Sequence, residues 1–182
     1  FKGPLKVSSN GRYFLDGAGK PFLWLGDTAW PLLTAYSRKD AEAHLALRAS
    51  QGFNVIQTVA AWEHGGSHSG TMFSGRIPGP NPYGEPAWKE DPARPNPKFF
   101  RHVDQLLTVA DKLGLALAMV PAWGYYINDN PVLTTANAAV YGKWLGKRYK
   151  NRKNLIWMNG GDRIPTGFED VYRALAAGIR AG

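Results

Sequence analysis

Short apolar runs alternate with longer amphipathic stretches along most of this chain. An apolar run of seven or fewer residues is too short for a helix and is typical of a strand. The stretches between the runs place apolar residues three or four positions apart, as on one face of a helix. The pattern predicts strands over residues 21–27, 53–59, 115–120 and 154–159, and helices over 38–51, 97–113, 134–150 and 166–179. The first strand, Pro21–Asp27, is expected to be buried on both faces.

Polar residues and glycines mark the ends of the predicted helices. Ser37 suits an N-cap, and Asn96 followed by Pro97 suits the start of a helix. Gly52 and Gly114 fit the left-handed residue that ends one. The first 21 residues differ, because Leu5–Val7 and Arg12–Leu15 flank a turn of Ser, Asn and Gly. We expect a β-hairpin over residues 1–21.

Four successive strand–helix units indicate an α/β protein with a parallel sheet covered by helices. A doubly wound sheet and a (β/α)8 TIM barrel both have this order of elements. A complete barrel needs roughly 250 residues, so residues 22–182 would form only its first four β/α units. The chain starts at Phe1 without a Met. We favour the barrel, and expect a fragment whose remainder lies in missing sequence or in another chain.

Tryptophans and carboxylates gather where the four predicted strands end. In both candidate folds this is the end at which active sites form. Carboxylates suit acid/base or nucleophilic work on a glycosidic bond, and aromatic faces suit the C–H faces of sugar rings. The sequence therefore predicts a carbohydrate pocket, to which Asp162 would contribute a carboxyl group. The residues expected to line it are Asp27, Trp30, Trp62, Glu63, His64, Trp123, Tyr125, Asn159 and Gly161.

Each of the three acids also has a purely structural interpretation. Asp162 follows two glycines, which let the backbone turn tightly beside a ligand, but it could equally cap the loop before the last helix. Asp27 could cap a turn, and Glu63 could be a surface loop residue. The pattern alone leaves these alternatives open.

The net charge of +8 and the pI near 9.8 raise the question of an acidic partner. The densest basic run, Lys143–Lys153, lies at the end of the third predicted helix, where cations favour the helix C-terminus. That end is opposite the predicted pocket, so we expect no nucleic-acid partner.

Several other classes of function lack their motifs. Without cysteine there is no disulfide, no Cys-ligated metal and no thiol nucleophile. Gly65 and Gly66 separate His64 from His68, which argues against a helical metal site, and glycine-rich nucleotide motifs are absent. We therefore expect no metal and no cofactor. No apolar run approaches the roughly 18 residues of a membrane span, so no membrane partner is expected.

Three segments resemble the apiosidase-like catalytic domains, glycoside hydrolase family 140. They are Leu23–Trp30, Gly52–Gln57 and Trp157–Asp162, and their order and spacing fit nearly the whole chain. The resemblance implies a (β/α)8 barrel and a retaining glycosidase that acts on pectic side chains of plant cell walls and releases apiose-linked sugar. A secreted or periplasmic location would follow from that substrate. The family's acid/base aspartate, at the end of strand four, maps onto Asp162.

The resemblance also shows what is missing. The family's nucleophile is a glutamate near the end of strand seven, which four units do not reach. Two alternatives therefore remain: a barrel fragment that binds carbohydrate without catalysis, or a small α/β protein that binds an anionic partner.

Overall fold

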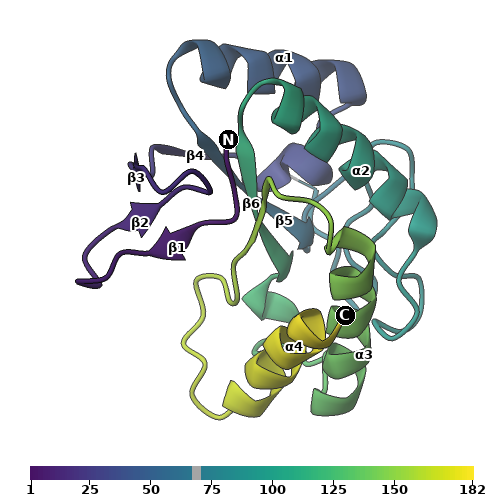
Figure 1. Ribbon diagram of the computed structural model, residues 1–182. Helices are drawn as coiled ribbons and strands as arrows, with labels where there is room; N and C mark the ends of the chain where they lie inside the picture. Colours follow the sequence, from purple (N-terminus) through teal and green to yellow (C-terminus); the bar gives the residue numbers. More distant parts are fainter. Residues whose placement is uncertain (67–70) are drawn as a thin grey trace.

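A four-stranded parallel sheet forms the centre of the computed structural model, which describes residues 1–66 and 71–182 (Figure 1). Its strands are β4 (Gly26–Thr28), β5 (Val55–Ala61), β6 (Ala116–Ala122) and β7 (Leu155–Trp157), and they lie side by side in chain order. A doubly wound sheet reverses its strand order at a switch point, whereas a TIM barrel does not. The fold is therefore a partial TIM barrel, as the sequence predicted.

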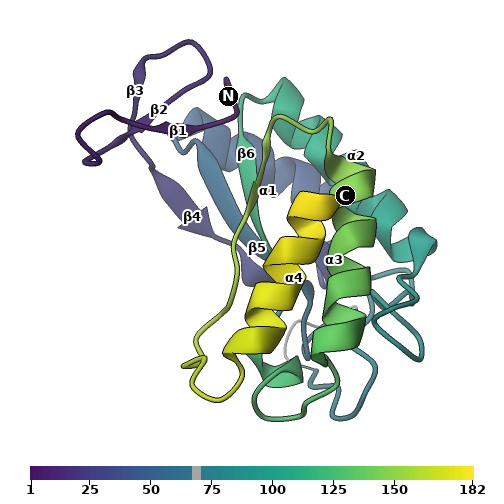
Figure 2. The same cartoon turned by 60° about the horizontal axis from the view of Figure 1, so that its bottom comes forward.

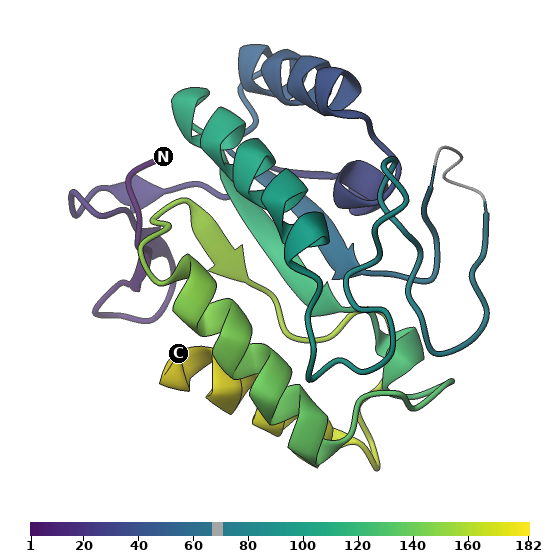
Figure 3. The same ribbon diagram turned by 90° about the vertical axis from the view of Figure 1, so that its right-hand side faces the viewer.

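Each strand is followed by one long helix. The helices are α1 (Arg38–Ser50), α2 (Pro97–Lys112), α3 (Thr135–Tyr149) and α4 (Glu169–Ala181). Two of these helices begin at the predicted caps: the Ser37 hydroxyl accepts from the Asp40 N–H, and the Asn96 side chain accepts from the Lys98 N–H. Helices α1, α2 and α3 cover one side of the sheet (Figure 3), and α3 and α4 lie side by side (Figure 2).

The start of the last helix differs from the prediction. The sequence predicted a helix from residue 166, but α4 begins at Glu169, after Phe168, which provides no side-chain cap. The Glu169 carboxylate instead accepts from the N–H of Gly167, which has φ +84°. The turn at Gly167 delays the helix by three residues, because a left-handed residue cannot lie within an α-helix.

The predicted strand over residues 21–27 is also different. Its first part, β3 (Pro21–Phe22), pairs antiparallel with β2 (Phe14–Leu15), which pairs with β1 (Lys6–Val7). Only Gly26–Thr28 joins the parallel sheet. Between them Leu23 and Leu25 are 79% and 44% exposed, so this run is not buried on both faces. The reason is its position: among the described residues, no strand pairs with the outer edge of β4.

The main core lies between the sheet and the helices. Alternate residues of the strands, such as Ile56 and Leu117, point toward Phe99, Phe100 and Leu106 on α2. The other face of the sheet, which would line the interior of a barrel, has two smaller clusters around Val55 and Val59 with half-buried aromatic neighbours. No helix in the described ranges, 1–66 and 71–182, is long and apolar enough to cross a bilayer.

Candidate active site

A pocket of about 350 Å³ opens on the inner face of the sheet, toward the carboxyl ends of the strands. Five of the ten predicted site residues contribute to it. The pocket is lined by Trp30, Gln57, Val120, Trp123, Met158, Asn159, Gly160, Gly161 and Asp162. The strand-to-helix segments after β4, β6 and β7 thus meet where the sequence predicted a carbohydrate pocket.

Two tryptophans form the aromatic part of this pocket. The rings of Trp30, after β4, and Trp123, after β6, have centroids 5.2 Å apart and planes inclined by 59°. Trp62 extends the cluster, with its ring 6.4 Å from Trp123 and 4.8 Å from His64. Trp62 and His64 do not themselves line the pocket. Indole rings at a pocket wall suit a ligand with both apolar and polar faces, such as a sugar.

The segment that carries Asp162 lies directly on the end of β6. A Cβ atom on Gly161 would come within 3.1 Å of the Trp123 ring and 3.2 Å of the Gly124 nitrogen, so a larger residue would push these neighbours back by a few tenths of an ångström. The Asn159 side chain lines the pocket and donates to the backbone carbonyl of Tyr172 on α4, at 3.0 Å. The loop is thereby attached to both a strand and a helix.

Asp162 lies at the rim of the pocket, with its side chain 61% exposed. Its Oδ1 accepts a hydrogen bond of 2.9 Å from the Arg163 guanidinium, whose Nε donates to Asp129 at 2.6 Å. Asp162 does not cap α4, which begins seven residues later. Of the two interpretations left open by the sequence, the geometry favours a carboxyl group presented to the pocket.

Glu63 is buried, unlike a surface loop residue. It is 5% exposed, and burial raises the pKa of its carboxyl, with Arg163 opposing and Asp162 reinforcing that shift. Its Oε2 has no hydrogen-bond partner among the described residues. Glu63 does not line the pocket, but its charge acts on the groups at the rim.

Neither Asp27 nor Tyr125 lines the pocket, although Tyr125 packs against the cluster of Val59, Val120 and Trp123 beside it. Asp27 faces α1, where its carboxylate lies 3.0 Å from His44 Nε2 and 3.2 Å from Arg48 Nε. Tyr125 packs edge-on against Tyr126, with ring centroids 5.1 Å apart. Asp27 therefore joins a strand to a helix, and the prediction that it lines a sugar subsite receives no support from its position.

Two polar side chains at or near the pocket were not predicted from the sequence. Gln57 lines it and donates to the Thr28 hydroxyl at 3.2 Å. The sequence does contain an indication of Gln57. Its amide lies in a mostly apolar strand, on the same face as Val55 and Val59, and a polar side chain on that face indicates contact with solvent or a ligand. Nothing in the local sequence pattern indicates Arg163, because its partner Asp129 is distant in the sequence.

No cluster of three or more potential metal ligands occurs among residues 1–66 and 71–182. His68, which the sequence pattern paired with His64, lies outside the described residues.

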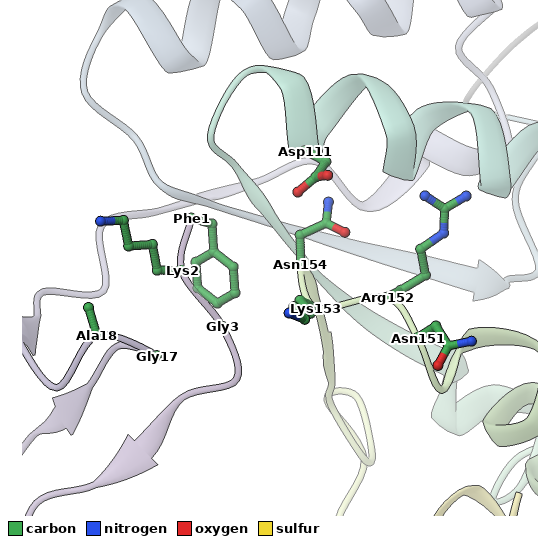
Figure 4. A pocket seen from close by; sticks show the side chains of 10 residues that line it. All are labelled: Phe1, Lys2, Gly3, Gly17, Ala18, Asp111, Asn151, Arg152, Lys153 and Asn154. Carbon is green, nitrogen blue, oxygen red and sulfur yellow. The ribbon is translucent and has the colours of Figure 1, made fainter.

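A second pocket, of about 440 Å³, lies at the amino ends of the strands (Figure 4). Arg152 and Lys153, from the basic run, line it together with Asp111 and Asn154. Within the same run, Arg148 forms a bidentate pair with Asp104 on α2. In TIM barrels this end serves stability rather than chemistry. The basic run is thus remote from the candidate active site.

Solved structures support the interpretation as a glycoside hydrolase. A glycoside hydrolase family 5 protein from Bacteroides vulgatus is 29% identical with a TM-score of 0.84, and a second glycoside hydrolase is 31% identical with a TM-score of 0.83. Both matches cover 98% of this chain, which spans only 37% and 38% of those proteins.

An exo-β-1,4-mannosidase from an Opitutaceae bacterium, 17% identical over 96% of this chain and 32% of its own, shares the fold with a TM-score of 0.65. A search of curated proteins gave no match. Residues 8–182 match the family described as "Apiosidase-like, catalytic domain". The chain therefore belongs to the apiosidase-like catalytic domain family of glycoside hydrolases.

Proposed function

We propose that this chain is the first half of the catalytic barrel of a retaining glycoside hydrolase that acts on pectic side chains of plant cell walls. One observation carries the proposal: the Asp162 carboxyl lies at the rim of a pocket with two indole rings in its wall. The indoles would stack on a sugar ring, while the carboxyl reaches the glycosidic oxygen at its edge. A substrate of this kind would place the protein outside the cytoplasm, secreted or periplasmic.

The proposed mechanism is a double displacement. Protonated Asp162 gives its proton to the leaving glycosidic oxygen, while a glutamate from the second half of the barrel, about 5–5.5 Å away, attacks the anomeric carbon. Asp162 then removes a proton from the water that hydrolyses the glycosyl–enzyme intermediate. The proton returns to Asp162, and the sugar is released with its configuration retained.

The first step needs a protonated Asp162. Arg163 lies beside the carboxylate, and the side chain is largely exposed. Closing the barrel would both desolvate Asp162 and bring a second carboxylate close, and each change raises the pKa of a carboxyl group. The second half of the barrel thus supplies the nucleophile and also the environment that makes Asp162 an acid.

The test uses the complete barrel, incubated with pectic oligosaccharides, with NMR detection of the anomeric configuration of the product. Asp162→Asn should reduce turnover of substrates with poor leaving groups by about 10²- to 10⁴-fold, because the general acid is lost. Asp170→Asn, on the exposed start of α4, removes the same charge and serves as the control. Wild-type turnover in Asp162→Asn would exclude the proposed role. Binding without hydrolysis by the complete barrel would instead support a carbohydrate-binding module.

A further inference from the structure

The pocket at the amino ends of the strands has walls from three separate parts of the chain (Figure 4). They are the N-terminal segment with the turn at Gly17, the end of α2 at Asp111, and the turn over residues 151–154 between α3 and β7. A Cβ atom on Gly3 would overlap the Lys153 carbonyl oxygen, so a larger residue would push the first and third of these parts away from each other. The pocket is therefore formed by tertiary packing, and not by one exposed loop.

Asn154 contributes a buried polar group to the wall. The residue is 2% exposed, and its Nδ2 donates to the carbonyl oxygens of Leu107 at 2.9 Å and Leu115 at 3.4 Å. Because a carbonyl oxygen can only accept, these contacts fix which end of the amide is the nitrogen. In the described parts of the chain no group donates to the Asn154 Oδ1. That oxygen is thus an acceptor for a hydroxyl group of a ligand in the pocket.

Two cations of the wall have no structural partner. Lys2 and Lys153 come from the two ends of the chain, and neither forms a salt bridge within residues 1–66 and 71–182. Arg152 differs, because its guanidinium donates to the Thr108 hydroxyl on α2 at 3.2 Å. Packing against α2 therefore accounts for Arg152, whereas no contact of the described residues accounts for the two lysines.

The acids near this pocket do not balance its positive charge. Of the residues that line it, Asp111 is the single carboxylate, beside three cations. Asp16, on the adjacent turn, accepts from the N–H groups of Ala18 and Lys20, both at 2.9 Å. The N–H of Lys20 contributes most to lowering the pKa of this carboxyl, and the charge of Lys2 contributes a smaller part. Asp16 is thus held in its own turn, and the pocket favours an anion.

We propose that this pocket binds a segment of oligogalacturonate, the polyanionic backbone chain of pectin. In the view of Figure 4 the Phe1 ring lies between Lys2 and Lys153. The ring contacts the C–H face of one sugar, each ammonium pairs with a carboxylate, and Asn154 Oδ1 accepts from a hydroxyl. The choice of this polymer rests on the proposed function. Because the pocket and Asp162 lie at opposite ends of the sheet, the site holds the polymer without contacting the bond that is cleaved.

Calorimetric titration of the complete barrel with an oligogalacturonate, at low ionic strength, tests the proposal. The fully methyl-esterified oligomer keeps the sugar rings but lacks their charge, and should bind about tenfold more weakly. Lys2→Gln and Lys153→Gln should each weaken binding of the charged oligomer by about two- to fivefold. Lys147→Gln is the matched control, because it removes the same charge from the exposed surface of α3, outside the pocket, and should leave the affinity unchanged.

A second pair of variants adds a charge instead of removing one. Ala18 lines the pocket on an exposed turn, so a longer side chain there leaves the core intact. Ala18→Glu should abolish binding of the charged oligomer, because its carboxylate repels those of the ligand. Ala18→Gln has the same size without the charge and should keep most of the affinity. Equal losses in the two variants would contradict recognition by charge. Circular dichroism of each variant checks that the fold is kept.

The titrations have outcomes that would overturn the proposal. Equal affinity for the charged and the methyl-esterified oligomer is one, and losses in Lys2→Gln and Lys153→Gln no larger than in Lys147→Gln are another. Tighter binding of a single-stranded oligonucleotide, lost in the same lysine variants, would assign the pocket to nucleic acid instead. Asp162→Asn should bind the oligomer as the wild type does. Its turnover therefore tests the proposed function separately from this site.

Discussion

The two faces of the parallel sheet differ in what their side chains contact: those on one face pack against the helices, and those on the other lie near the pocket. Residues that point outward, such as Ile56 and Leu117, are fully buried beneath α1 and α2. Residues that point inward lie among half-buried aromatics and include the pocket residue Gln57. Because side chains alternate along a strand, one register determines both faces. The outer face thus carries the larger part of the core, whereas the inner face combines two smaller clusters with the pocket.

Truncating one aromatic side chain on each face should separate these roles most clearly. Phe100 is fully buried in the outer core, so Phe100→Ala should lower the free energy of unfolding by about 3–5 kcal/mol. Trp30 is half-buried and lines the pocket, so Trp30→Ala should cost less stability but lose sugar affinity in the complete barrel. Urea unfolding and calorimetric titration measure the two effects. Equal destabilisation by both variants would contradict the division between the faces.

The outer face also contains a buried titratable group. His102, on α2, is 4% exposed, packs edge-on against Tyr83, and no side chain hydrogen-bonds to its ring. Burial, opposed by the Tyr36 backbone and assisted by the charge of Arg38, lowers its pKa to about 4. Between its ordinary pKa and about 4, the unfolded chain binds the proton and the folded chain does not. Stability should therefore be lost as the pH falls through this range, by about 3 kcal/mol in total.

The measurement compares the wild type with His102→Phe. Urea unfolding at pH 7 and at pH 4.5 gives a pH-dependent loss of stability for each protein, and titration of the carboxylates contributes equally to both. The difference between the two losses is the contribution of His102. An equally large loss in His102→Phe would show that this histidine is not the source.

Features that depend on neighbouring residues in the sequence could be predicted for both faces of the sheet, whereas features that depend on contacts between distant residues could not. The fold followed from periodicity and caps such as Ser37 and Asn96, which are short-range signals. Asp27 and Asp162 both follow apolar runs, and sequence alone could not distinguish them. The structure does, because the strand over 21–27 is divided and its last part turns Asp27 toward α1. The contact of Asp129 with Arg163 joins residues 34 positions apart and was not predictable.

Substitution of Asp27 is expected to have the smallest effect on stability. It tests whether this carboxylate belongs to the outer face of the sheet or to the pocket. Its carboxylate lies between His44 and Arg48 with 15% of the side chain exposed, so it belongs to the outer face although a pocket role was predicted. Asp27→Asn should reduce the free energy of unfolding by about 1 kcal/mol, as expected for a partly buried ion pair, and should leave sugar affinity unchanged. Asp162→Asn, at the pocket, should do the reverse. Loss of affinity in Asp27→Asn without loss of stability would mean that the register of β4 in the complete barrel turns this carboxylate inward.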